Sequence, residues 1–198
     1  MRFAAIVNTF APDLEVQMGR IMRFIRDTGL DAKDGVLVMC SRQPECIHIC
    51  IHNPEAAFPE TVDVMGELCM PQSVAEYLRD VLTDTDLFIM PGNMFGNELA
   101  VHIGSFLDGS SLTGVTAIDT RSNTDRGKLI VKRNIYANHV SGTFEMKKKP
   151  FCISLDICLS ADPVQMELQK TQPTAVLHES GFWSDLSMEP RETPGDLD

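Results

Sequence analysis

The sequence lacks long apolar runs and is short of positive charge. No stretch of its 198 residues approaches the roughly 20 consecutive apolar residues of a membrane-spanning helix, and residues 1–13 reach polar positions too early for a secretory signal. With 17 basic against 28 acidic residues, the net charge of -11 disfavours nucleic acid as a partner, because phosphate binding needs a basic surface. We therefore expect a cytoplasmic protein that binds neither a membrane nor nucleic acid.

Familiar signatures of phosphate loops and catalytic nucleophiles are also missing. The chain has no Gly-x4-Gly-Lys-Ser/Thr loop, no Gly-x-Gly-x-x-Gly fingerprint and no Gly-x-Ser-x-Gly elbow. Its six cysteines are scattered over a chain long enough to fold without disulfides, so reduced thiols are expected. These absences leave no recognisable phosphate loop and no recognisable setting for a catalytic nucleophile.

Charge is divided unevenly along the chain. Residues 121–149 contain eight basic and two acidic side chains, whereas residues 159–198 contain eight acidic and two basic ones. The basic segment predicts a rim that meets an acidic partner or the acidic end of the same chain.

Apolar runs alternate with helical patterns over the first two thirds of the chain. Strand-like runs are residues 2–7, 35–40, 45–53, 87–90 and 114–119, and helical spacing follows Pro12, Pro71 and the turn at 91–97. This alternation predicts a Rossmann-like α/β domain with a mostly parallel sheet covered on both faces.

The pattern changes in the last third. Residues 128–146 read as two alternating strands with a turn near 137–139, and residues 150–158 add one more strand. From residue 159 onward periodicity is lost and prolines accumulate. We expect a domain over residues 1–158 that ends with an antiparallel hairpin, and an acidic linker or arm over 159–198, in which 173–180 could form a further strand.

The turn PGNMFGNELA (91–100) is the first candidate site. It joins a predicted strand to a predicted helix, where backbone N–H groups and the helix dipole favour an anion. Gly92, Asn93, Gly96 and Asn97 are the candidate ligand contacts. A structural turn with Asn93 or Asn97 as the helix cap is the favoured alternative.

The segment CIHICIH (46–52) is the second candidate. Alternation places Cys46, His48, Cys50 and His52 on one strand face, and these residue types ligate zinc and other soft metals. Neighbours on one face are about 6.5 to 7 Å apart, so four in a row cannot close a tetrahedron unaided. A strand with small thiols and imidazoles on its less hydrophobic face is favoured over a metal site.

Residues 72–156 resemble the N-terminal domain of the electron transfer flavoprotein alpha subunit. The resemblance is carried by DLFIMPGNMFGNELAVHIGSFL (86–107), LTGVTAID (112–119) and GKLIVKRNIYANHVSGTFEMKKKPFCISL (127–155). Within the last segment the residues that match the family's hairpin are Arg133, Ile135, Tyr136, Ala137 and Pro150. Asn97 and Asn138 depart from the family, which has arginine and glycine at those places.

This resemblance implies a three-layer fold of the adenine nucleotide alpha hydrolase type that docks with a beta-type subunit, or with a second copy acting as one. It implies FAD-mediated electron transfer only in the complete complex, because the family's second, FAD-binding domain has no counterpart in these residues. A cut at the domain boundary and a naturally short protein both fit this ending. Arg133 and Tyr136 become candidate partner-facing or structural residues.

An adenine-nucleotide-binding or nucleotide-processing α/β protein is the alternative that the resemblance implies. It keeps open an AMP-type site near Gly92 to Asn97. Such enzymes carry a Ser-Gly-Gly pyrophosphate loop after the first strand, where this chain has VNTFAPD (7–13). We expect no catalytic residue and no tightly bound cofactor.

Overall fold

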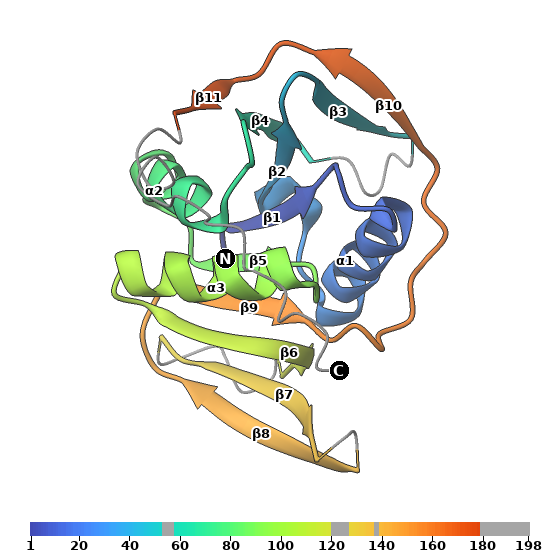
Figure 1. Cartoon of the computed structure of the whole chain (residues 1–198). Helices are drawn as coiled ribbons and strands as arrows, with labels where there is room; N and C mark the ends of the chain where they lie inside the picture. Colours follow the sequence, from blue (N-terminus) through green and yellow to red (C-terminus); the bar gives the residue numbers. More distant parts are fainter. Residues whose placement is uncertain (53–57, 120–126, 137–138, 179–198) are drawn as a thin grey trace, which may run out of the picture.

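A nine-stranded sheet forms the centre of the computed structural model, which describes residues 1–52, 58–119, 127–136 and 139–178 (Figure 1). Its strand order is β11-β4-β2-β1-β5-β9-β6-β7-β8, and β3 and β10 form a separate two-stranded sheet. The strands are β1 (Phe3–Asn8), β2 (Gly35–Arg42), β3 (Cys46–Ile51), β4 (Glu60–Gly66), β5 (Leu87–Met90), β6 (Ser110–Ile118), β7 (Leu129–Ile135), β8 (Val140–Met146), β9 (Phe151–Leu155), β10 (Met166–Thr171) and β11 (Ala175–Leu177). The helices are α1 (Leu14–Thr28), α2 (Pro71–Val81) and α3 (Met94–Phe106), with a short 3-10 turn at Ala32–Asp34.

Most of the large sheet is parallel, as the sequence predicts. Strand β1 lies between β2 and β5 and is parallel to both, and β9 is parallel to β5 and β6. The antiparallel pairs lie at one edge of the sheet, where β7 pairs with β6 on one side and with β8 on the other. The α/β fold class with a terminal antiparallel hairpin is therefore confirmed.

Two apolar cores lie on opposite faces of this sheet. Alternate residues of β1 belong to different cores: Phe3 and Ala5 pack with α1, whereas Ala4 and Ile6 pack with α2 and α3. Figure 1 shows α1 on one side of the sheet and the other two helices on the opposite side. Burial on both faces explains why the parallel strands are continuous apolar runs rather than alternating ones.

Each helix begins or ends at a residue that the sequence marks. Gly29 ends α1 with a φ of 69°, in the left-handed region that glycine adopts without a Cβ penalty. Pro71 occupies the first turn of α2, where its missing N–H costs no hydrogen bond. Asn93 caps α3 through its side chain, which confirms one of the two capping residues predicted for this turn.

Among the described residues no helix has the length and apolarity needed to cross a membrane.

Three features differ from the sequence-based expectation. Strand β4 had no predicted counterpart, and β3 pairs with β10 instead of joining the large sheet. The segment after residue 158, expected as a linker or arm, contains β10, which pairs with β3 and has no predicted counterpart, whereas β11, which pairs with β4, lies within the further strand predicted at 173–180. In Figure 1 the segment passes outside α1 before it reaches these strands. The predicted hairpin turn at Ala137 and Asn138, and residues 179–198, lie outside the described residues.

Candidate functional site

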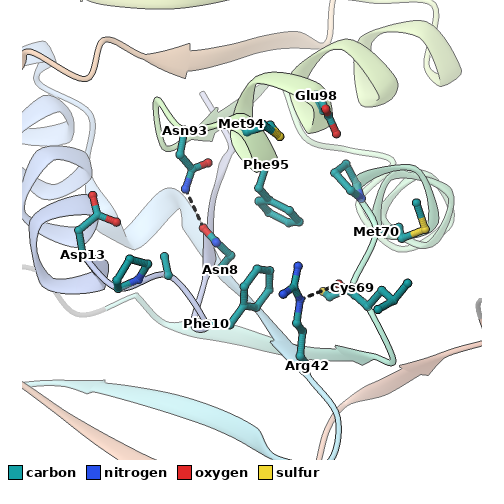
Figure 2. A pocket seen from close by; sticks show the side chains of 14 residues that line it. Asn8, Phe10, Asp13, Arg42, Cys69, Met70, Asn93, Met94, Phe95 and Glu98 are labelled. Carbon is teal, nitrogen blue, oxygen red and sulfur yellow. Dashed lines mark hydrogen bonds between the residues drawn. The ribbon is translucent and has the colours of Figure 1, made fainter. Parts of the chain in front are cut away.

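A cavity of about 520 Å³ opens at the carboxyl ends of the central parallel strands. Its walls come from the loops after β1, β4 and β5, from the end of β2 and from the first turns of α2 and α3 (Figure 2). The lining residues are Asn8, Phe10, Ala11, Pro12, Asp13, Arg42, Leu68, Cys69, Met70, Pro71, Asn93, Met94, Phe95 and Glu98. This is the edge at which open α/β sheets bind ligands, so we take it as the candidate site.

Asn93 links β1 to α3 at the floor of the cavity. Its Oδ1 accepts a hydrogen bond of 2.8 Å from the Gly96 N–H, and its Nδ2 donates one of 3.1 Å to Asn8 Oδ1. Asn8 is buried at the last position of β1. The capping oxygen therefore already occupies one of the helix N–H groups that could otherwise hold an anion.

The other three residues of the predicted turn site face the protein rather than the cavity. A Cβ on Gly92 would lie 2.0 Å from the Leu155 carbonyl oxygen, and a Cβ on Gly96 would lie 2.0 Å from the Pro91 carbonyl oxygen. Asn97 is hydrogen-bonded through Oδ1 to the Ser154 hydroxyl on β9. Both glycines thus allow close backbone packing, and of the four predicted contacts only Asn93 lines the cavity.

A cation and two aromatic rings form one wall. The Arg42 guanidinium carbon lies 4.0 Å above the centre of the Phe10 ring, and its Nε donates a 2.8 Å hydrogen bond to the Leu68 carbonyl. The Phe10 and Phe95 rings meet edge to face, with centres 5.9 Å apart. Figure 2 shows the Arg42 side chain beside these rings. Such a wall suits a ligand that combines a ring with a single anionic group.

The remaining polar groups of the cavity limit the charge it can accept. Asp13 and Glu98 also line it, and the Asp13 carboxylate accepts a 2.6 Å hydrogen bond from Gln17. Two carboxylates therefore oppose the one guanidinium, an arrangement that disfavours a ligand with several phosphates.

A pair of thiols lies under the cavity wall. Cys69 lines the cavity with a backbone φ of 53°, and the fully buried Cys40 is its neighbour. A hydrogen bond with the Cys69 thiol, together with burial, raises the pKa of Cys40 well above its ordinary value. Because the thiolate is the reactive form, Cys40 is poorly suited to act as a nucleophile at neutral pH.

The two histidines of the predicted metal face lie beside different carboxylates. His48 Nδ1 lies 3.0 Å from Asp63 Oδ2 on β4, whereas His52 lies beyond the end of β3 and pairs with Glu167 at 3.8 Å. Burial and then the Asp63 charge raise the pKa of Cys46. Within the described ranges no cluster of three or more His, Cys, Asp or Glu residues has metal-binding geometry, Cys50 included.

Arg133 and Tyr136 lie in the hairpin and not at the cavity. Arg133 is half-buried on β7, opposite Gly142 of β8. Tyr136 follows β7 with a φ of 51° and is 78% exposed. The cavity and the hairpin are therefore two distinct features.

Sequence reasoning missed the residues that give the cavity its character. Phe10 comes two residues after β1 and Arg42 ends β2, 32 positions later in the chain. The sequence feature that could have identified them is their position: each lies at or just after the end of a strand, and the two strands would be neighbours in a parallel sheet. The side chains at the ends of predicted parallel strands therefore indicate the lining of such a cavity better than the spacing of glycines does.

The comparisons with known proteins give one partial match. No family model matches the chain. It is 30% identical over 88 residues to YgcQ of Escherichia coli (strain K12), whose name describes it as a candidate electron transfer flavoprotein subunit. The match covers 41% of this chain and 29% of YgcQ, so the chain spans less than a third of that relative's length. The similarity supports a relationship to electron transfer flavoproteins in general. It does not identify which subunit or which domain of such a protein this chain corresponds to.

Proposed function

We propose that this chain is an alpha-type subunit domain of an electron transfer flavoprotein, which docks with a beta-type subunit and supports FAD-mediated electron transfer in the complex. The observation that carries the proposal is the similarity to YgcQ, a protein named as a flavoprotein subunit, in a chain with a Rossmann-like sheet. A second copy of the chain in the place of the beta-type subunit is the other form of this assembly.

The cavity fits FAD poorly. FAD carries a pyrophosphate, which needs several cations or uncapped helix N–H groups. Here Arg42 faces Asp13 and Glu98, and Asn93 already accepts the hydrogen bond of the Gly96 N–H. We infer that FAD is held by other parts of the complete complex, and we assign it no step in this cavity.

Co-expression with a beta-type electron transfer flavoprotein subunit encoded beside this chain tests the proposal. We expect the two chains to co-elute in one peak on size-exclusion chromatography, and we expect the isolated chain to show no flavin absorbance. A stoichiometric flavin spectrum of the isolated chain would contradict the inference about FAD. If each subunit elutes alone at micromolar concentration, the docking function is wrong.

A second function, binding of an AMP-type mononucleotide, is favoured by the cavity itself. The rings of Phe10 and Phe95 offer apolar surface for a planar base, and Arg42 offers one cation for one phosphate. This reading agrees with a single phosphate better than with ADP or ATP, because the two carboxylates repel additional charge.

Thermal denaturation with AMP and ATP tests this second function. At a ligand concentration of 100 Kd, a folded-state ligand adds about 2.7 kcal/mol of stability, which is roughly 5 to 10 °C for a chain of this size. Arg42→Gln should remove the AMP shift, while the control Arg79→Gln, an exposed arginine of α2, should keep it. Gly96→Val is a poor probe, because its side chain would collide with the Pro91 carbonyl. Equal shifts for both arginine variants would exclude the cavity as the site.

A further inference from the structure

One face of the β7–β8 hairpin changes from buried to exposed along its length. In the antiparallel register Leu129 pairs with Met146, Val131 with Phe144, Arg133 with Gly142 and Ile135 with Val140, so these eight residues share one face. At the base of the hairpin Leu129, Val131 and Met146 are buried in the core beside α1. Toward the turn, Phe144 is 36% and Val140 48% exposed. The apolar pattern therefore continues beyond the part of the sheet that α1 covers.

The opposite face of the same hairpin is polar toward the turn. Lys132 and Asn134 of β7 pair there with Thr143 and Ser141 of β8. Figure 1 shows β8 as the outermost strand of the sheet, and no described helix lies over it. An ordinary solvent-exposed hairpin needs no apolar residues toward its turn, so the difference between its faces is evidence of a covered face.

Arg133 lies in the middle of the apolar face. It is half-buried, and none of the ion pairs among the described residues includes it. Its Nε is 3.5 Å from the point that a Cβ would occupy if Gly114 carried a side chain. The Arg133 side chain therefore lies across β6 at Gly114. By contrast Lys128 is paired with Glu145 at 2.7 Å. A half-buried guanidinium amid apolar side chains favours an incoming carboxylate, which supplies a strong charge-assisted hydrogen bond.

We propose that the exposed end of this face, made of Arg133, Ile135, Val140 and Phe144 with the adjacent Tyr136, is the docking surface for the second subunit. The partner presents an apolar patch with an Asp or Glu that pairs with Arg133. The inference rests on the proposed function, since it names the surface by which that complex forms. Two hairpins that face each other would bring two Arg133 side chains together, which charge repulsion opposes, so we assign this surface to the beta-type subunit and not to a symmetric pair of this chain.

Two pairs of neighbouring substitutions separate this face from its opposite. Val140→Asp adds a carboxylate to the docking face, and Ser141→Asp adds the same charge one residue later on the other face. Arg133→Glu and Lys132→Glu likewise make the same charge inversion on opposite faces. The two variants of each pair have the same net charge and lie at nearly the same position along the hairpin. A difference in binding between them therefore reports the face of the hairpin and not its overall charge.

The experiment measures binding of each variant to the separately purified beta-type subunit by isothermal titration calorimetry, with a thermal melt of each free variant as the folding control. We expect Val140→Asp and Arg133→Glu to raise Kd about 30-fold or more, the size of a hot-spot loss. Ser141→Asp and Lys132→Glu should stay within about threefold of the unmodified chain. Equal effects within both pairs overturn the docking face and leave the proposed function standing.

Two other outcomes also decide the matter. If the unmodified chain forms no complex with the beta-type subunit, the proposed function and the docking face fall together. If the unmodified chain forms a homodimer that Val140→Asp alone disrupts, the face is an interface between copies and the acidic partner is wrong.

Discussion

Asn93 shows how a residue in the candidate turn site has a structural role. Its side chain joins the end of β1, through Asn8, to the first turn of α3, through the Gly96 N–H. Sequence spacing could identify it as a cap but could not show that the same amide also bonds β1.

Two substitutions of Asn93 separate these two bonds. Asn93→Ala removes both and leaves Asn8 Oδ1 buried without this donor, so we expect a loss of about 1 to 3 kcal/mol of stability. Asn93→Asp keeps the capping oxygen and loses only the donor to Asn8, so its loss should be smaller. Urea denaturation curves measure both values. If the Asp variant is as unstable as the Ala variant, the cap contributes nothing.

Cys152 predicts a dependence of stability on alkaline pH. Burial on β9 raises its pKa to about 12, whereas an unfolded thiol ionises near about 8.5. The unfolded state therefore loses its proton first, and stability falls as pH rises from about 8.5 toward 12, by at most about 1.4 kcal/mol per pH unit for this thiol. Between pH 8 and 10.5 the urea midpoint of Cys152→Ala should fall less steeply than that of the unmodified chain. Parallel slopes would mean that another group is responsible.

At the scale of elements, the segment 159–165 that leads to β10 is held against α1 by a close backbone approach. A Cβ on Gly19 would lie 2.2 Å from the Asp162 carbonyl oxygen, and the Asp162 N–H donates a 3.1 Å hydrogen bond to the Gly19 carbonyl. Arg20 Nε donates to the Leu159 carbonyl at 3.0 Å, and Arg26 pairs with Asp162. This contact explains a glycine in the interior of a helix.

Gly19→Ala tests that contact through the sign of its effect. In an unobstructed helix this change adds up to about 1 kcal/mol of stability, so a loss of about 1 to 3 kcal/mol would show the collision with residue 162. Limited proteolysis should also cut residues 159–165 faster in the variant. Val16→Ala, on the exposed side of the same helix, should change neither measurement appreciably. A more stable Gly19→Ala would contradict the contact.

The elements also show where sequence reasoning reaches and where it stops. The parallel strands β1, β2, β5, β6 and β9 and the three helices were predictable because burial on two faces, or on one helical stripe, leaves a strong apolar pattern. Strand β10 leaves none: it is exposed along nearly all its length, and its pairing with β3 depends on contacts between distant segments. Strand β4 carries Asp63, whose burial beside His48 is visible only once β3 lies over it. The cavity likewise depends on Phe10 and Arg42 meeting through neighbouring strands.

At the scale of the whole molecule, charge is separated between an acidic body and a basic hairpin. The net charge is -11, yet Lys128, Lys132, Arg133 and Lys147 lie in or directly beside β7 and β8. Association with an acidic partner through this hairpin should therefore be accelerated by electrostatic steering, which salt screens.

Stopped-flow or surface-plasmon measurements of association with the beta-type subunit test this steering. Raising NaCl from 50 to 500 mM should lower the association rate constant about tenfold and change the dissociation rate much less. Because steering depends on the summed field, Arg133→Glu and Lys132→Glu should both weaken the salt dependence of association. Only Arg133→Glu should speed dissociation, since that side chain alone is proposed to form a desolvated pair in the complex. An association rate that is independent of salt would show that the basic hairpin does not meet the partner first.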